Sequence, residues 1–313
     1  MVLEFRVELQ GFSKDHKILG RTRMSFTFGF EIKEEDVEKG DSSSSCQSIP
    51  ELTTTSGGAL KECPPPPLPA REITVSFSEV PQPTATSGLT LEGGEVLSYI
   101  TCPESKCLEG STSESDLIPN VYEGGMKIWE CSVDLVQYLR EIAYPWTGKN
   151  VLELGCGAGL PGILALTKGA GKIHFQDYNE EVLQTVTIPN VSLNTGTGVY
   201  AARCKFFAGD WSGVQKLLTE EFKSTSDKYD VILTSETIYN TASYQKLHDL
   251  MKSVLAPNGT VYLAAKTHYF GVGGGTRLFE EFLRKEDVFS SEVCKVYSEG
   301  VNREILKIEM KKS

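Results

Sequence analysis

The second half of the chain alternates short apolar runs with segments in which apolar residues recur at helical spacing. The apolar runs predict strands over 150–154, 172–177, 204–207, 229–234 and 261–265. Helical spacing predicts helices over about 130–142, 160–169, 179–194 and 241–255. The tail predicts two more strands, 293–298 and 304–310, joined by a turn at Gly300. Alternating strands and helices are typical of an α/β fold with a parallel sheet covered on both faces, and the last pair suits an antiparallel edge.

The first third of the chain has a different pattern. Residues 24–32 alternate large apolar with small or polar side chains, which predicts one short strand. From about 33 to 115 the chain is rich in serine, proline, threonine and glycine, and includes four serines at 42–45 and four prolines at 64–67. Such a segment buries too little apolar surface to offset its ordering entropy. We therefore expect an N-terminal region, 1–116, that is mostly disordered but allows short ordered stretches such as 73–77, and a folded domain, 117–313.

Composition and charge narrow the class of protein. The 313 residues are 40% hydrophobic, enough for a globular core, and no apolar run is long enough for a membrane helix. The first residues lack the apolar core of a secretory signal, so we expect a soluble intracellular protein. Of the net charge of −11, residues 1–120 carry −9 (19 acidic, 10 basic) and residues 121–313 carry −2 (23 acidic, 21 basic). The nearly neutral second part argues against direct nucleic-acid readout, while the acidic first part suits a basic protein partner or simply solubility.

The eight cysteines do not predict a metal site. Cys102 and Cys107 form a C-x4-C pair, but no second pair or nearby histidine completes a zinc site. We expect no metal, and reduced thiols in a reducing compartment.

A glycine-rich turn follows the first strand of the second half and opens the next helix. It reads Glu153-Leu154-Gly155-Cys156-Gly157-Ala158-Gly159, and glycine permits both a tight turn and a close approach of backbone to a ligand. A dinucleotide site with the spacing G-x-G-x-x-G would need a glycine where the chain has Leu160. The turn therefore predicts a nucleotide site at the end of a parallel strand, but not a dinucleotide site.

Two carboxylates flank this turn. Glu153 lies two residues before Gly155, and Asp177 ends the next predicted strand. A diphosphate disfavours a carboxylate close by, whereas S-adenosylmethionine carries a cationic sulfonium and an ammonium that suit Glu153. A carboxylate at the position of Asp177 accepts hydrogen bonds from both ribose hydroxyls. The pattern predicts S-adenosylmethionine as the cofactor, the alternative being a turn that serves chain reversal only.

Two further predicted strands end in polar loops at the same edge. After the third strand come Gly209, Asp210 and Trp211, where Asp210 could accept from the adenine amine and Trp211 could cover the ring or belong to the core. After the fourth strand comes 235–239, Ser-Glu-Thr-Ile-Tyr. Amino-methyltransferases of nucleic acids carry a Pro-Pro-aromatic motif at this position, and its absence here disfavours a nucleic-acid substrate.

Five segments together resemble the protein-histidine methyltransferases, which belong to the seven-strand methyltransferases that modify proteins through a D/E-x-x-Y motif. The segments are 121–131, 153–159, 174–179, 234–240 and 268–275, and the motif is Glu236 to Tyr239. The resemblance covers about 117–313 and touches 24–32, so residues 1–23 look like an upstream extension. Glu153 stands where many members have aspartate, which keeps the charge.

The resemblance implies a fold, an activity and a set of site residues. The fold is the seven-strand, Rossmann-like class I methyltransferase sheet. The activity is methyl transfer from S-adenosylmethionine to the τ nitrogen of a histidine in a basic large-subunit ribosomal protein, with a role in ribosome biogenesis and translation. It also implies residence in cytoplasm, nucleus and nucleolus. Apart from the resemblance, we expect a monomer without membrane attachment. The matching cofactor residues are Ile128, Trp129, Glu130, Cys131, Ser132, Glu153, Gly155, Gly157, Gly159, Gln176, Asp177, Tyr178, Gly209, Asp210, Trp211 and Ser235.

The chemistry of the acceptor indicates what Glu236 and Tyr239 would do. A lysine, with a pKa of about 10.4, is only about 0.1% neutral near pH 7.4, whereas a histidine, with a pKa of about 6.5, is already mostly neutral. A histidine enzyme therefore needs no strong base. It needs a hydrogen bond that fixes the ring tautomer and accepts developing charge, and Glu236 and Tyr239 are the candidates for these catalytic roles.

Other interpretations of these residues stay open. Glu236 could instead only order its loop, and the aromatic residues Tyr122, Trp129, Tyr239, Tyr269 and Phe270 could line a slot for imidazole or belong to the core. The alternative functions are a lysine methyltransferase of the same superfamily and a non-catalytic ribosome-assembly binder, which the intact glycines disfavour.

Overall fold

The computed structural model describes residues 5–12, 18–26, 66–76, 80, 83, 85–100, 121–195 and 203–312, which form two compact units, Met1–Pro64 and Pro65–Ser313. The first unit contains an antiparallel hairpin of β1 (Phe5–Phe12) and β2 (Ile18–Phe26). The strand predicted over 24–32 begins earlier than expected, because β2 pairs with β1 from Ile18 onward. Residues 27–32 lie outside the described part.

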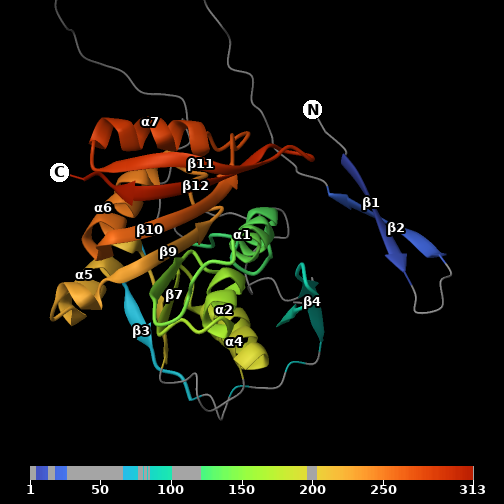
Figure 1. The fold of residues 1–313 in the computed structure, drawn as a ribbon, viewed down its shortest axis with the longest axis horizontal. Coiled ribbons are helices and arrows are strands. Elements are labelled where there is room, and N and C mark those ends of the chain that lie inside the picture. The colour runs from blue at the N-terminus through green and yellow to red at the C-terminus, as the bar shows by residue number, and fades with distance from the viewer. Residues whose placement is uncertain are drawn as a thin grey trace, which may run out of the picture. The chain divides into compact units, whose positions relative to one another are not determined.

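The second unit is built on one eight-stranded sheet (Figure 1). Its order is β11-β12-β10-β9-β6-β7-β8-β3. The bounds are β3 Arg71–Ile73, β6 Asn150–Leu154, β7 Lys172–Asp177, β8 Cys204–Ala208, β9 Tyr229–Ser235, β10 Leu255–Lys266, β11 Phe289–Tyr297 and β12 Arg303–Met310. Strands β6 to β10 are parallel, while β12 pairs antiparallel with β10 and β11 with β12. The predicted class I sheet with its antiparallel edge is confirmed, and β3 adds an eighth, antiparallel strand beside β8.

Alternation along the strands explains how both faces of this sheet are covered. On β9, Val231 and Leu233 belong to one apolar cluster and Ile232 to the other. The first cluster includes residues of α1 (Glu130–Glu141) and α2 (Leu160–Thr167), and the second includes residues of α5 (Trp211–Glu221), α6 (Tyr244–Val254) and α7 (Thr276–Glu286). Among the described residues no helix has the length and apolar character needed to cross a membrane.

The helices differ from the predictions in three places. The helix predicted over 179–194 is divided into α3 (Glu180–Val182), a π-helical segment (Leu183–Thr187) and α4 (Ile188–Thr195). Pro189 has no N–H, so it cannot donate the hydrogen bond of an ordinary α-helical turn. Helices α5 and α7 were not predicted, although Phe279, Phe282 and Leu283 have helical spacing.

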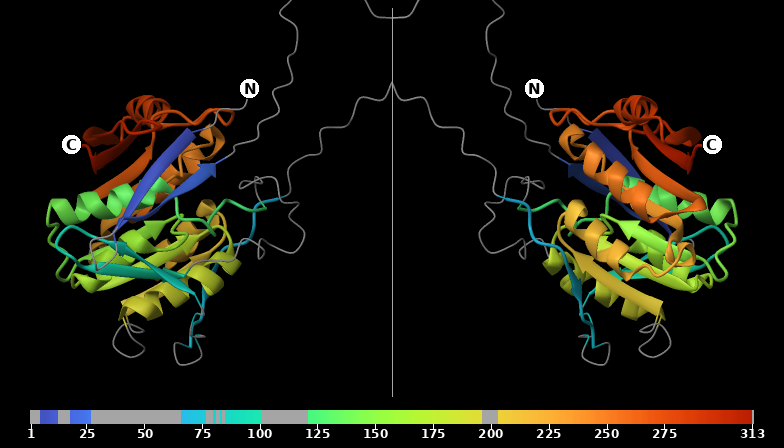
Figure 2. Two further views of the ribbon diagram at one scale, coloured as in Figure 1. Left: turned by 90° about the vertical axis from the view of Figure 1, so that its right-hand side faces the viewer. Right: turned by 90° about the vertical axis from the view of Figure 1, so that its left-hand side faces the viewer.

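Residues 66–100 are ordered in part, contrary to the expectation of disorder up to 115. Besides β3, they form the hairpin of β4 (Thr86–Thr90) and β5 (Val96–Ile100), which lies beside α4 (Figure 2). Two asparagine side chains of α4 hold its backbone: Asn194 Oδ1 accepts from the N–H of Ser98 (2.9 Å), and Asn190 Oδ1 accepts from that of Ile100 (2.8 Å). The compact unit therefore begins at Pro65, well before the expected boundary at 116/117.

Candidate active site

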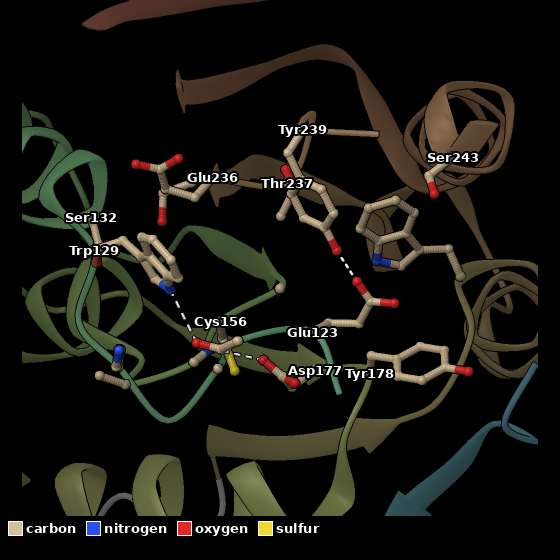
Figure 3. Close-up of a pocket in the computed structure, with 18 of the residues that line it drawn as sticks. Glu123, Trp129, Ser132, Cys156, Asp177, Tyr178, Glu236, Thr237, Tyr239 and Ser243 are labelled. Carbon is tan, nitrogen blue, oxygen red and sulfur yellow. Dashed lines mark hydrogen bonds between the residues drawn. The ribbon is translucent and has the colours of Figure 1, made fainter. Parts of the chain in front are cut away.

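A pocket lies where the parallel strands β6, β7, β8 and β9 end (Figure 3). It encloses about 930 Å³ of empty space, part of which is open to solvent. The lining includes these predicted site residues: Ile128, Trp129, Ser132, Gly155, Gly157, Asp177, Tyr178, Gly209, Asp210, Trp211, Ser235, Glu236 and Tyr239. Because the strands are parallel, segments that are up to about a hundred residues apart in the sequence meet at this edge.

The glycine turn provides a bare backbone floor for the pocket. Gly155 and Gly157 have positive φ angles of 59° and 49°, which favour glycine. A Cβ at position 155 would lie 2.5 Å from Cγ2 of Thr237, and one at 157 would lie 3.1 Å from the carbonyl oxygen of Gly125. Asp177 borders this floor, since its Oδ2 accepts from the N–H of Gly157 (2.9 Å). A ligand can therefore approach the backbone of the turn, whereas a side chain at position 155 or 157 would be too close to its neighbours.

The side chain of Gln176 joins two segments of the pocket, the glycine turn and the segment 209–211 after β8. Its Oε1 accepts from the N–H of Gly155 (3.2 Å) and from Nε1 of Trp211 (2.9 Å), and its Nε2 donates to the carbonyl oxygen of Gly209 (3.0 Å). The side chain is buried and does not line the pocket. Gln176 therefore positions the walls of the pocket and has no direct access to a ligand.

The charges around the pocket select against phosphates. The lining carries four acidic residues, Glu123, Asp177, Asp210 and Glu236, and two basic ones, Lys127 and Lys246. The lysine Lys246 is engaged with Asp210, at 2.7 Å from Nζ to Oδ2. A ligand that is neutral or cationic fits this balance, and a diphosphate does not.

At one end of the pocket, Asp210, Trp211 and Tyr178 are held by the chain itself. Asp210 caps α5 through Oδ1, which accepts from the N–H of Ser212 (3.0 Å), so both of its oxygens have partners. Tyr178 Oη accepts from the N–H of Leu68 (3.0 Å), and the carbonyl of Leu68 accepts from the N–H of Asp210 (3.2 Å). The segment before β3 thus braces this end, a contact that the sequence did not indicate.

At the opposite end, Glu236 has an unusual conformation directly after β9. Its φ angle is 57°, a region that costs a residue with a side chain about 1–2 kcal/mol, and its N–H donates to the carbonyl of Ala264 (3.0 Å). Oε2 accepts from the hydroxyl of Tyr269, whereas the buried Oε1 accepts no hydrogen bond from any described residue but is paired with Lys266, whose Nζ lies 3.8 Å away. The backbone strain at a carboxylate that lines the pocket points to a functional role for Glu236.

Glu123 is a pocket residue to which the sequence assigned no role. The hydroxyl of Tyr239 donates to its Oε2, and this hydrogen bond lies between the end with Glu236 and Trp129 and the end with Tyr178 (Figure 3). Glu123 sits on the loop before α1, which the Nε1 of Trp129 fixes by donating to the carbonyl of Gly124 (3.0 Å). Only the tertiary contact with Tyr239 singles Glu123 out among the acidic residues.

Five of the predicted cofactor residues do not line the pocket: Glu130, Cys131, Glu153, Gly159 and Gln176. Cys131 is fully buried, and Gly159 precedes α2 as its N-cap. Glu153 was expected to face the cationic cofactor, but it is level with Phe175, two positions before the end of β7, and its Oε2 accepts from the N–H of Gly162 in α2 (2.8 Å). Among the histidines, His174 is buried, and burial lowers its pKa to about 3.

The burial of Glu153 predicts that the free energy of unfolding depends on pH. Burial raises its pKa from 4.5 to about 8, so the folded state binds this proton more tightly than the unfolded state. Its contribution to stability is full below about pH 4.5 and is lost as the pH rises toward 8. Glu153→Gln keeps the acceptor for Gly162 but removes the titration. We expect the free energy of unfolding of this variant to gain about 2 kcal/mol over that of the wild type between pH 6 and pH 8.

Denaturant unfolding at pH 6 and pH 8 measures this difference. Glu281→Gln is the matched control, because Glu281 is an exposed glutamate of α7 paired with Lys285. Its difference from the wild type should stay constant with pH. Parallel pH dependences of the wild type and Glu153→Gln would contradict the assignment.

Comparison with known proteins identifies relatives of this chain. Residues 120–281 match the family described as lysine methyltransferase. The histidine protein methyltransferase 1 homolog of Dictyostelium discoideum is 47% identical over 66% of this chain and 64% of its own length, and that of Bos taurus 44% identical over 64% and 59%. Histidine protein methyltransferase 1 of Saccharomyces cerevisiae is 32% identical over 67% of this chain and 70% of its own length. The chain thus spans about 60% of the length of the first two relatives.

Solved structures are similar at lower identity. A ribosomal protein L11 methylase from Lactobacillus delbrueckii subsp. bulgaricus is 19% identical, with a TM-score of 0.42 over 67% of this chain and 93% of its own. A magnesium protoporphyrin IX methyltransferase from Synechocystis PCC 6803 with bound SAH is 14% identical, with a TM-score of 0.42 over 57% and 82%.

Proposed function

The chain belongs to the methyltransferase family of the histidine protein methyltransferase 1 homologues, and from this premise we propose that it methylates the τ nitrogen of a histidine in a protein. Family membership implies S-adenosylmethionine as the methyl donor. When bound, this cofactor supplies an electrophilic methyl group on its sulfonium and leaves as S-adenosylhomocysteine. The remaining task of the protein is to hold the acceptor ring in the correct tautomer and orientation.

The residues of the pocket fit this cofactor. The side-chain-free floor at Gly155 and Gly157 admits a ligand against the backbone, and the excess of acidic over basic residues suits a sulfonium and an ammonium. Asp177 would hold the ribose hydroxyls, because each of its oxygens has a lone pair beyond those used by the N–H groups of Gly157 and Asn179. Trp211 lines the braced end, where it would hold the adenine.

The observation that carries the proposal is the strained Glu236 in the lining of the pocket, whose Oε1 accepts no hydrogen bond from a described residue and lies 3.8 Å from the ammonium of Lys266. An imidazole whose π nitrogen donates its N–H to Oε1 has its τ nitrogen unprotonated, with the lone pair available for the methyl carbon. As the ring gains positive charge, the carboxylate stabilises it, and it can receive the π proton when the product becomes neutral. Tyr269 fixes the other oxygen, so the acceptor direction of Oε1 is set by the fold.

For the identity of the substrate we propose a basic protein of the large ribosomal subunit. The net charge of −11 favours a basic partner, and the resemblance to protein-histidine methyltransferases supports a ribosomal one. On the same basis we propose that the protein acts in cytoplasm, nucleus and nucleolus, with a role in ribosome biogenesis and translation.

One experiment tests the proposed function directly. The purified protein is incubated with methyl-labelled S-adenosylmethionine and a lysate of cells that lack the endogenous activity. The labelled protein is identified, and acid hydrolysis then gives the modified amino acid. We expect τ-methylhistidine. Methyllysine would show a lysine methyltransferase instead, and cofactor binding without any labelled protein would favour a non-catalytic binder.

Asp177 predicts a pH dependence of cofactor binding. Burial raises its pKa to about 6, and only its ionised form accepts from both ribose hydroxyls. Affinity should therefore be constant above about pH 7 and fall below pH 6, reaching about tenfold weaker at pH 5. Calorimetric titration with S-adenosylhomocysteine at pH 5, 6 and 7.5 measures it. Asp177→Asn should bind weakly at every pH, and an equally flat profile in the wild type would refute the role of Asp177.

A further inference from the structure

Lys266, the last residue of β10, sits beside the acceptor end of the pocket and has no role in the proposed chemistry so far. Its side chain is only 13% exposed, and its Nζ lies 3.8 Å from Oε1 of Glu236 and 3.7 Å from Oε2 of Glu130. Oε1 of Glu236 is the oxygen that accepts no hydrogen bond. The ammonium is therefore next to the atom that would receive the acceptor ring.

Two aromatic rings also lie close to this ammonium. Nζ lies 5.4 Å from the ring centroid of Trp129 and 5.7 Å from that of Tyr269, both within the range of cation–π attraction. Two carboxylates and two aromatic faces are the features with which proteins recognise ammonium ligands. We call these four residues, Trp129, Glu130, Glu236 and Tyr269, the cation cage. They come from the start of α1, the end of β9 and the loop after β10, so only the fold assembles them.

We propose that Lys266 occupies the cation cage in place of a substrate ammonium and thereby restricts the acceptor to neutral groups such as imidazole. A lysine acceptor arrives as an ammonium and would meet a like charge at the point where Glu236 would otherwise attract it. A histidine acceptor arrives mostly neutral and meets no such repulsion. Lys266 is thus a specificity-determining residue, and this inference rests on the proposed function only in taking Glu236 as the group that meets the acceptor.

Side-chain analogues test the inference without catalysis. The protein, saturated with S-adenosylhomocysteine, is titrated at about pH 8.5 with n-butylammonium, which mimics lysine, or with 4-methylimidazole, which mimics histidine. Binding is followed by nuclear magnetic resonance. We expect the wild type to bind 4-methylimidazole at least tenfold better than n-butylammonium. In Lys266→Ala and in Lys266→Met, which keeps the apolar stem, this preference should fall at least tenfold.

Two control variants separate charge from packing. Lys266→Arg retains the positive charge and should retain the preference, and Lys285→Ala removes an exposed lysine of α7 and should change nothing. If the Ala and Met variants kept the preference within threefold of the wild type, or if the Arg variant lost it as they do, the inference would be overturned. Failure of the proposed function would be seen in a different experiment. In that case the wild type would produce no methylhistidine in the labelling experiment, regardless of the outcome of the analogue titrations.

Discussion

Glu236→Gln is expected to lower kcat for histidine methylation about 100-fold, while the affinity for S-adenosylhomocysteine stays within twofold of that of the wild type. The substitution keeps the shape of the side chain but removes its charge. The amide can no longer stabilise a positively charged ring, and a buried amide nitrogen cannot accept the N–H of the acceptor. Tyr269 can still donate to the amide oxygen, so the loop after β9 should keep its conformation.

Steady-state kinetics with the labelled substrate protein, together with calorimetry, checks both parts of this result. Glu281→Gln serves as the matched control, because it removes the same charge from an exposed site on α7. Full turnover in Glu236→Gln would mean that Glu236 only orders its loop. Loss of cofactor affinity along with turnover would mean that Glu236 maintains the pocket and has no catalytic role.

Gly155→Ala is expected to weaken cofactor binding about 100-fold or more. The new Cβ would lie 2.5 Å from Cγ2 of Thr237, closer than such atoms approach in proteins. Either the turn or the loop carrying Thr237 must move, and both line the pocket. The positive φ angle of 59° adds about 1–2 kcal/mol of backbone strain, so the variant should also be less stable.

Gly300→Ala is the control that introduces a similar backbone strain without a steric clash of the new Cβ. Gly300 has a φ angle of 74° in the turn between β11 and β12, and a Cβ there would meet no atom within 4 Å. This variant should lose a similar free energy of unfolding but keep its cofactor affinity. Calorimetric titration with S-adenosylhomocysteine and thermal unfolding give the two quantities. Equal affinities of Gly155→Ala and the wild type would show that the glycine turn is not the cofactor site.

Local pattern was sufficient to predict the central strands and the strand ends at which the pocket lies. Strand β6, the glycine turn and the acidic end of β7 are each encoded within a few residues, so apolar runs and glycine spacing reveal them. The ordered segment 66–100 was missed because its stability comes from contacts with distant elements. Its composition resembles that of a disordered linker, yet Asn190 and Asn194 of α4 satisfy its backbone.

The candidate site was predicted unevenly for a similar reason. Asp177 was placed correctly at the pocket because it ends a strand, and side chains at that edge lie at the switch point of the sheet. Glu153 pairs with Phe175, two positions before Asp177 on the same face of the sheet, so it lies further inside the sheet, where it accepts from the N–H of Gly162 in α2. Sequence spacing alone did not distinguish Asp177, which lines the pocket, from Glu153, which does not.

By itself the sequence determined the order of the central strands, the bare glycine turn and the presence of an acid after β9, because these depend on neighbouring residues. Only the tertiary structure decided that Glu123 meets Tyr239, that Gln176 joins the glycine turn to the segment after β8, and that Lys266 lies among aromatic rings and carboxylates. Parallel pairing brings strand ends from distant parts of the chain to one edge, so contacts between them have no signature in local sequence.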